Sequence, residues 1–312
     1  MDLFSKKEIK KLLKKHQISP SKRLGQNFLV DKSVVKKVVD AADLKPEDII
    51  LEIGPGIGTL TQKLADRVKK VIAVEKDPNM IAILGETLKR LRNVDLIQAD
   101  IRRLKFQITK GEEDSAAFFF RLVSLSQNSA SKFQANSKIQ IPKNYKIVGN
   151  LPFYLTAPVI RQLLERTDAR RLYAVFVVQK EVGQRICAKP PRMSILAVSV
   201  QVYAETKIMG YISKNSFWPQ PKVDAAIIKI LPLKMKSHDR RISSQRKNLF
   251  FKVVKAGFSQ PRKQLINNLS KGLKLNRVKV ENWLKKNSIQ PTRRAETLEV
   301  QDWIKLTKSI KI

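Results

Sequence analysis

Three glycines at alternating positions follow a short apolar segment in the sequence Glu52-Ile53-Gly54-Pro55-Gly56-Ile57-Gly58. Glycine at this spacing allows a tight turn and lets a ligand approach the bare backbone at the end of a strand. The loop alone is compatible with NAD, with S-adenosylmethionine or with a purely structural turn. Its spacing differs from G-x-G-x-x-G, which favours an adenosyl ligand over a dinucleotide pyrophosphate.

Two carboxylates follow at the ends of the next two apolar segments. Glu75 directly follows residues 71–74, and Asp100 comes shortly after residues 94–97. The Glu75 carboxylate could accept both ribose hydroxyls of an adenosyl group, and Asp100 could accept a hydrogen bond from the adenine amino group. Each acid alone is equally typical of a solvated charge at a strand end. Their order behind the glycine loop favours one shared adenosine pocket.

An asparagine ends a later apolar segment, in Gly149-Asn150-Leu151-Pro152-Phe153. The exocyclic amine of adenine is a poor nucleophile because its lone pair is delocalised into the ring. The side-chain oxygen of Asn150 and the carbonyl of Leu151 could accept its two N–H bonds and so expose that lone pair. Pro152 fixes the turn, and Phe153 offers a ring face on which base stacking contributes about 1–3 kcal/mol. The alternative interpretation is a proline that ends a strand before a helix.

These motifs require strands that end at a common edge. From Ile49 onward apolar segments alternate with helical ones, as is typical of βαβ units in a parallel sheet covered on both faces. The predicted strands are 49–53, 71–74, 94–97, 145–148, 172–178, 195–202 and 225–231. From Lys234 the pattern changes to basic helical segments, such as 244–256 and 278–286. We predict an α/β domain over residues 1–233 and a smaller, basic, all-α domain over residues 234–312.

Charge divides the chain into parts with different expected roles. The formal net charge is +35 over 312 residues, which indicates a polyanionic partner, and nucleic acid is the commonest one. Residues 31–100 hold 12 basic and 12 acidic side chains, whereas residues 234–312 hold 21 basic and 5 acidic ones. The neutral part contains the glycine loop and both carboxylates, so we expect the basic parts to bind phosphates.

Composition excludes several classes of protein. A hydrophobic content of 43% is too high for a disordered polybasic tail. The only cysteine, Cys187, rules out an internal disulfide, and two histidines make a metal site unexpected. Apolar runs stay well short of the roughly 18 residues of a spanning helix, and the N-terminus lacks the apolar core of a signal peptide. We therefore expect a cytoplasmic protein without a bound metal or a membrane partner.

Two further segments carry predictions of their own. Residues 1–19, with paired lysines and interspersed leucines, predict a basic amphipathic helix. RNA or the ribosome is favoured over a membrane surface as its partner, because the rest of the chain is basic too. Residues 107–141 interrupt the strand–helix order and predict an inserted loop, either a tolerated insertion or a functional segment. Basic pairs at 240–241, 246–247, 262–263 and 293–294 could follow phosphates, although each alone is typical of a solvated helix face.

Several motifs occur together, in order, over residues 20–300. They are G-Q-N-F-L (25–29), E-I-G-P-G-I-G (52–58), V-E-K-D (74–77), A-D (99–100), G-N-L-P-F (149–153), V-Q-K-E-V (178–182), F-W-P-Q-P-K-V-D (217–224) and F-S-Q-P-R-K-Q-L (258–265). This set resembles the KsgA family of S-adenosylmethionine-dependent, small-subunit (16S) rRNA adenine N6,N6-dimethyltransferases.

The resemblance implies a class I Rossmann-like methyltransferase domain with a smaller basic all-α C-terminal domain. It implies methylation of two adjacent adenosines, twice each, in the 3′-terminal hairpin of 16S rRNA within an immature small ribosomal subunit, by a monomeric protein. By motif position, the residues implied to contact S-adenosylmethionine are Asn27, Leu29, Gly54, Gly56, Glu75, Asp100 and Asn150. Asn150, Leu151 and Phe153 would position the target base, and Phe217 would close its other face.

Two features of the sequence depart from the family pattern. The family usually has tyrosine at position 153, so the ring face is kept and the hydroxyl is lost. The 107–141 insertion is also longer than expected for the family.

Two alternative functions remain. A large-subunit rRNA adenine methyltransferase of the antibiotic-resistance type would resemble Asn-Ile-Pro-Tyr at the reactive motif and would usually be shorter. A non-catalytic assembly factor could keep the fold, but the presence of intact motif residues disfavours it, namely Gly54, Glu75, Asp100 and Asn150.

Overall fold

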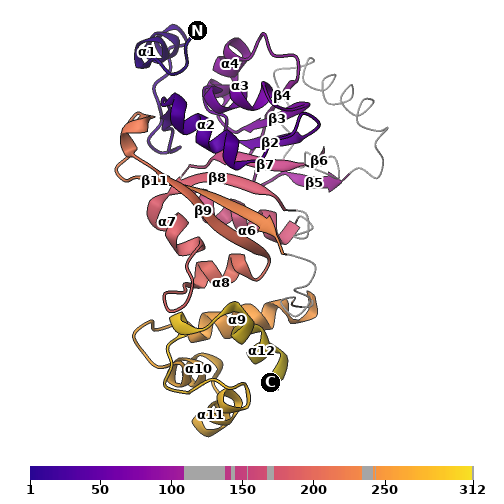
Figure 1. The fold of residues 1–312 in the computed structure, drawn as a ribbon, viewed down its shortest axis with the longest axis vertical. Coiled ribbons are helices and arrows are strands. Elements are labelled where there is room, and N and C mark those ends of the chain that lie inside the picture. Colours follow the sequence, from indigo (N-terminus) through magenta and orange to yellow (C-terminus); the bar gives the residue numbers. More distant parts are fainter. Residues whose placement is uncertain are drawn as a thin grey trace. The chain divides into compact units, whose positions relative to one another are not determined.

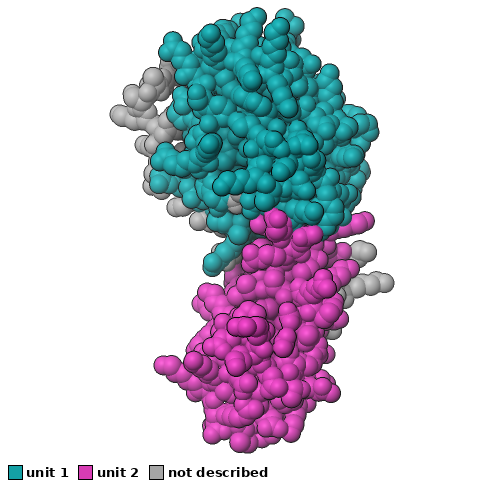
Figure 2. Space-filling view, turned by 90° about the vertical axis from the view of Figure 1, so that its left-hand side faces the viewer, with its two compact units in different colours: residues 1–180, 208–230 teal, residues 181–207, 231–312 magenta. Residues whose placement is uncertain are grey.

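The computed structural model of this protein describes residues 1–108, 138–141, 145–152, 154–166, 172–233, 242 and 244–310. The chain divides into two compact units, residues 1–180 with 208–230 and residues 181–207 with 231–312 (Figure 2). Each unit has its own apolar core.

A seven-stranded sheet organises the first unit (Figure 1). Its order is β4-β3-β2-β7-β8-β11-β9, and the strands are β2 (Ile49–Ile53), β3 (Lys70–Glu75), β4 (Val94–Gln98), β7 (Lys146–Asn150), β8 (Ala174–Gln179), β9 (Ala204–Ile212) and β11 (Ala225–Pro232). The pairs β4–β3, β3–β2, β2–β7 and β7–β8 are parallel, whereas β11 pairs antiparallel with β8. The predicted α/β class is confirmed, and the strands that carry the motifs end at one edge of the sheet.

Helices alternate with these strands. They are α1 (Lys6–Lys15), α2 (Lys32–Ala41), α3 (Thr59–Ala65), α4 (Pro78–Thr87), α6 (Thr156–Arg166) and α7 (Lys180–Ile186). Every residue of β2 is buried, as expected of a central strand covered on both faces. Asp31 caps α2, because its carboxylate accepts hydrogen bonds from the backbone amides of Ser33 at 2.9 Å and Val34 at 3.2 Å.

A short antiparallel pair joins two segments that are far apart in the sequence. β1 (Phe28–Leu29) pairs with β10 (Phe217–Trp218), with Leu29 opposite Phe217. The 3₁₀ turn Lys214–Ser216 leads into β10, and the side chain of Ser216 donates to the Asp31 carboxylate at 3.0 Å. This pairing brings the G-Q-N-F-L and F-W-P-Q-P motifs together.

The predicted basic helix near the N-terminus is α1. Ser5 caps it, and its lysines are exposed. Its apolar residues Ile9, Leu12 and Leu13 are buried in a cluster with Ile57 and Met80 of the first unit. The apolar face of α1 is therefore already covered by protein.

The structure corrects the sequence prediction for residues 195–202. We predict a strand there, but the structure has the helix α8 (Ile195–Gln201). Ser194 caps α8 by accepting from the backbone amide of Ala197 at 3.0 Å, and Ala197 and Val198 are buried in the core of the second unit. A short apolar run has no clear period, so tertiary packing decides its conformation. For the same reason residues 181–207 belong to the second compact unit, upstream of the boundary expected near residue 233.

The predicted insertion at 107–141 lies mostly outside the described residues. Its flanks form a two-stranded parallel sheet, β5 (Lys105–Ile108) with β6 (Lys138–Ile141).

The described part of residues 234–310 is helical, as predicted. It consists of α9 (Lys247–Gly257), α10 (Leu265–Leu273), α11 (Arg277–Lys286), α12 (Val300–Ser309) and the 3₁₀ turns Ser244–Arg246 and Ala295–Thr297. Trp303 is the largest fully buried side chain, and it stacks on Phe258 with ring centroids 5.4 Å apart. A Cβ added at Gly257 would lie 2.3 Å from Trp303, so this helix contact requires glycine.

Candidate active site

One pocket of the first unit collects the predicted cofactor residues. It lies at the carboxyl ends of β2, β3, β4 and β7, where ligands bind in open α/β sheets. Its lining includes Asn27, Leu29, Gly54, Gly56, Glu75, Asp100 and Asn150. The sequence prediction named these seven residues, and the fold brings them together.

The glycine loop forms the floor of this pocket. Gly54 and Gly56 have φ angles of +70° and +61°, a region in which other residues are strained. A Cβ at Gly56 would lie 3.2 Å from the ring of Phe28. Any side chain at this position would therefore crowd the ring and take up space at the floor of the pocket.

Glu75 is held mainly by backbone amides. Its Oε1 accepts from the amides of Lys76 at 2.7 Å and Asp77 at 2.8 Å, and its Oε2 accepts from Gly56 at 3.3 Å. Burial raises the pKa of this carboxyl, while the three backbone hydrogen bonds oppose that rise. The remaining acceptor capacity of Oε2 suits a ribose hydroxyl.

Glu52 is a second buried carboxyl that lines the pocket. Its exposed fraction is 1%, and burial raises its pKa to about 8, with a further rise from the charge of Glu75. Within the described part of the chain, its Oε2 has no hydrogen-bond partner. Glu52 is therefore mostly protonated at neutral pH, and the sequence prediction assigned it no role.

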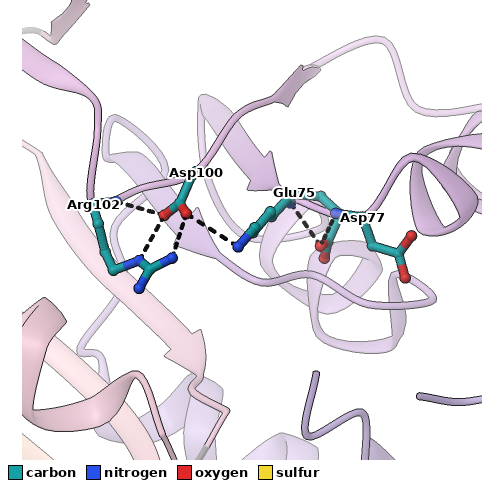
Figure 3. Close-up of polar contacts among 5 residues, drawn as sticks. Glu75, Asp77, Asp100 and Arg102 are labelled. Atoms are coloured by element: carbon teal, nitrogen blue, oxygen red, sulfur yellow. Dashed lines mark hydrogen bonds and ion pairs between the residues drawn. The ribbon is translucent and has the colours of Figure 1, made fainter. Parts of the chain in front are cut away.

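Asp100 is held by basic side chains (Figure 3). Arg102 donates its Nε to Oδ1 at 3.0 Å and its Nη2 to Oδ2 at 2.6 Å, and its backbone amide donates to Oδ1 at 3.0 Å. Lys76 forms an ion pair with Oδ2 at 3.2 Å. Hydrogen bonding to Arg102 holds the pKa of Asp100 well below its usual range. Asp100 thus stays ionised and accepts only.

A chain of amide contacts links the G-Q-N-F-L segment to the strand ends. Gln26 donates its Nε2 to the Asp77 carboxylate at 2.7 Å, and Asp77 also caps α4 by accepting from the amide of Asn79. Asn27 donates its Nδ2 to the carbonyl of Gly25 at 3.2 Å. The partnership between Gln26 and Asp77 crosses 51 residues of sequence, and the sequence offered no signal for it.

Asn150 ends β7 with a fixed amide orientation. Its Nδ2 donates to the backbone carbonyl of Asn27 at 2.9 Å. Because a carbonyl only accepts, this contact decides which end of the amide faces Asn27. Among the described residues none donates to Asn150 Oδ1, which lies at the pocket and can accept from a ligand amine.

Of the other residues predicted to contact the target base, some line the pocket and others do not. Pro152 lines the pocket, whereas Leu151 is 1% exposed and its backbone amide donates to the Val177 carbonyl. Phe153 lies outside the described residues. Phe217 is 3% exposed in the apolar core and is absent from the pocket lining, so its contact with a base stays a prediction. The sequence prediction missed Tyr154, which lines the pocket and is 45% exposed.

Comparisons with known proteins identify the family. A family model described as "Ribosomal RNA adenine dimethylase" matches residues 18–311. The chain belongs to this family. The resemblance to KsgA enzymes is thereby confirmed, and the ribosomal RNA small subunit methyltransferase A of Clostridium botulinum (strain Langeland) is 36% identical over 96% of this chain and 98% of that protein. The proteins of the same name from Alkaliphilus metalliredigens and Geobacillus kaustophilus are each 35% identical over 99% of this chain, and over 98% and 97% of their own lengths.

Two solved structures share the fold of this dimethylase. The 23S rRNA methyltransferase ErmE has a TM-score of 0.61 at 22% identity, covering 90% of this chain and 98% of that one. A dimethyladenosine transferase from Plasmodium falciparum also has a TM-score of 0.61, at 23% identity, covering 88% and 94%. These likenesses support the Rossmann-like methyltransferase fold.

The pocket of this dimethylase fits S-adenosylmethionine, the methyl donor of the family. Gly56 leaves room that a Cβ would fill, and the carboxylates of Glu75 and Asp100 line the pocket at the ends of successive strands. Asn27 and Asn150 also line the pocket and supply amide groups. Within the described ranges, no group of three or more His, Cys, Asp or Glu side chains is arranged to hold a metal ion.

The basic pairs of the second unit separate into two kinds. Arg246 donates to the backbone carbonyls of Thr307 at 3.1 Å and Lys308 at 2.6 Å. Arg293 donates to the side chain and the backbone carbonyl of Thr297, so both arginines form hydrogen bonds within the second unit. Arg262 and Lys263 are exposed in the loop between α9 and α10. The pair 240–241 lies outside the described residues.

Hydrogen bonds to its backbone hold the loop that carries Arg262 and Lys263 in place. The buried side chain of Asn268 donates to the carbonyls of Gly257 at 2.7 Å and Gln260 at 2.9 Å. The backbone amide of Leu265 donates to the Arg293 carbonyl at 2.7 Å. This loop therefore presents two cations on an ordered backbone.

Proposed function

We propose that this protein dimethylates the N6 amines of two adjacent adenosines in the 3′-terminal hairpin of 16S rRNA, with S-adenosylmethionine as donor, during assembly of the small ribosomal subunit. The observation that carries the proposal is the fixed amide of Asn150 in a pocket whose other walls suit an adenosyl group. Support for the small-subunit substrate comes from the relatives that match nearly the full chain.

The chain's own residues would prepare the adenine amine for attack. Asn150 Oδ1 and the Leu151 carbonyl would accept its two N–H bonds, and the nitrogen lone pair would then point at the donor methyl group. S-adenosylmethionine supplies an electrophilic methyl carbon on a sulfonium, so the displacement depends mainly on alignment. The methylated nitrogen is acidic enough to lose its proton to solvent, and this chemistry needs no general base.

Binding of the rRNA would fall to the basic parts of the chain. Arg262 and Lys263 are exposed on the ordered α9–α10 loop, and the lysines of α1 are exposed on the first unit. Phosphate contacts of this kind make affinity depend strongly on salt. The apolar face of α1 is buried in protein, which favours RNA over a lipid surface as its partner. No helix of the described residues is long and apolar enough to cross a membrane.

Two alternatives are less well supported. The likeness to ErmE concerns the fold alone, whereas the relatives at 35–36% identity carry the small-subunit name. A non-catalytic assembly factor has no need for a glycine loop at positive φ, a buried Glu75 and an oriented Asn150 in one pocket. We further propose that the enzyme acts in the cytoplasm as a monomer and without a metal.

A methylation assay tests the substrate assignment. Purified protein is incubated with labelled S-adenosylmethionine and with small or large ribosomal subunits from cells that lack the modification. We expect label in the 3′-terminal hairpin of small-subunit RNA, as dimethyladenosine at two adjacent positions. Label found only on large-subunit RNA would overturn the assignment of small-subunit RNA as the substrate. Absence of both label and cofactor binding would favour the assembly factor.

A further inference from the structure

The carboxylate of Asp100 already has a full set of donors. Oδ1 receives the backbone amide and Nε of Arg102, each at 3.0 Å. Oδ2 receives Nη2 of Arg102 at 2.6 Å and faces Nζ of Lys76 at 3.2 Å. A carboxylate offers about four acceptor sites, so these groups fill it. The side chain is 10% exposed, which leaves little room for a fifth donor.

This occupancy conflicts with the proposed role of Asp100. An adenine amino group must donate to the carboxylate, and therefore one of the present donors must leave. Arg102 makes three contacts, two of them a bidentate pair and the third from its backbone, so its loss would dismantle the turn after β4. Lys76 makes one contact, the longest of the four, from a side chain that is 47% exposed.

Lys76 can also move without disturbing the pocket. Its backbone amide donates to Glu75 Oε1 at 2.7 Å, which holds the main chain in place. Its ammonium sits on a flexible four-carbon stem and can turn into solvent. Meanwhile Arg102 keeps Asp100 in one orientation (Figure 3).

We propose that Lys76 occupies the place of the adenine amino group on Asp100 in the cofactor-free protein and leaves it when the adenosyl group binds. Arg102 is the positioning residue that holds the carboxylate throughout. This inference rests on the proposed function, because it takes the ligand of the pocket to be an adenosyl group. Its consequence is that Lys76 competes with the cofactor, although it lines the cofactor's own site.

Calorimetric titration with two uncharged ligands tests this competition. The first is 5′-methylthioadenosine, and the second is its analogue with hydrogen in place of the 6-amino group. Both are neutral, so removing a lysine charge has no direct Coulombic effect on either. The proteins are the wild type, Lys76→Met, and the matched control Lys89→Met, which removes an exposed lysine outside the pocket.

For Lys76→Met we expect methylthioadenosine to bind about two- to fivefold more tightly, the range that an exposed ion pair supplies. The analogue without the amine should bind Lys76→Met and wild type equally, since it has no donor that needs Asp100. Lys89→Met should match the wild type with both ligands. Arg102→Met should weaken methylthioadenosine, because Asp100 loses its orientation.

The inference is wrong if Lys76→Met binds methylthioadenosine no more tightly than the wild type, or if both ligands gain equally. It is also wrong if Arg102→Met gives the gain instead, because Arg102 would then be the displaced donor. If the wild type binds neither methylthioadenosine nor S-adenosylmethionine, the result would instead contradict the proposed function.

Discussion

The pocket of the first unit and the α9–α10 loop of the second unit use charge in opposite ways. In the pocket the acidic groups are buried or partnered: Glu75 is held by three backbone amides and Asp100 by Arg102 and Lys76. In the loop, the backbone is fixed by buried Asn268 so that two cations reach solvent. From this difference we expect cofactor binding to depend on shape and on fixed acceptors, and the proposed RNA binding to depend on exposed charge. The two activities should therefore be separable by mutation.

The largest expected effect concerns the floor of the pocket. Gly56→Val forces a branched side chain into a positive φ and against the ring of Phe28, so S-adenosylmethionine should bind at least about 100-fold more weakly. Binding to small subunits should stay within about twofold. Gly210→Val is the control, because a Cβ there has no atom within 4 Å. Titration calorimetry and filter binding measure the two affinities, and equal loss of both would break the separation.

The next effect concerns the loop. Reversing both charges, Arg262→Glu with Lys263→Glu, should weaken small-subunit binding about 10- to 100-fold and lower the salt slope of log K by about 2. The affinity for S-adenosylmethionine should not change. Lys89→Glu with Arg90→Glu reverses an exposed pair in the neutral part of the chain and serves as the control. A control pair that weakened RNA binding as much would show that total charge, rather than this loop, decides affinity.

A smaller effect concerns the core behind the loop. Gly257→Ala places a Cβ 2.3 Å from Trp303, and overpacking of this kind typically costs about 1–3 kcal/mol. Denaturant unfolding should show the loss in the second unit, with subunit binding reduced and S-adenosylmethionine binding retained. A matching loss of cofactor affinity would mean that the pocket depends on this core.

The last effect is a pH dependence confined to the pocket. Burial raises the pKa of Glu52 to about 8 from a usual value near 4.5, so the folded protein holds an extra proton between these values. The first unit should therefore lose stability as pH rises through this range, by about 1.4 kcal/mol for each pH unit. Glu52→Gln keeps the neutral shape and should flatten this slope. Melting curves from pH 5 to 9 measure it, and parallel slopes for the two proteins would show that Glu52 is ionised.

The positions of the pocket residues could be predicted because they follow strands. Glu75, Asp100 and Asn150 each come at or just after an apolar segment, and parallel strands bring such positions to one edge. What those side chains contact could not be predicted. The ion pair of Lys76 with Asp100 depends on rotamers and on a turn that only the fold defines.

The error at residues 195–202 has the same origin. The branched side chains of this segment favour a strand, yet burial in the core of the second unit makes it a helix. Phe217 is buried in the apolar core where β10 pairs with β1, and its predicted contact with a base stays a prediction. Local pattern specifies where a segment ends better than it specifies which face is covered.

The central claim is that Asn150 prepares the adenine amine while other residues hold the RNA. The most direct measurement compares methyl transfer and small-subunit binding for wild type and Asn150→Ala in parallel. We predict that the variant loses dimethyladenosine formation and binds small subunits as the wild type does, because the side-chain amide of Asn150 donates to the Asn27 carbonyl at the cofactor pocket. Comparable loss of methylation and of subunit binding would show that Asn150 is structural and would contradict the account.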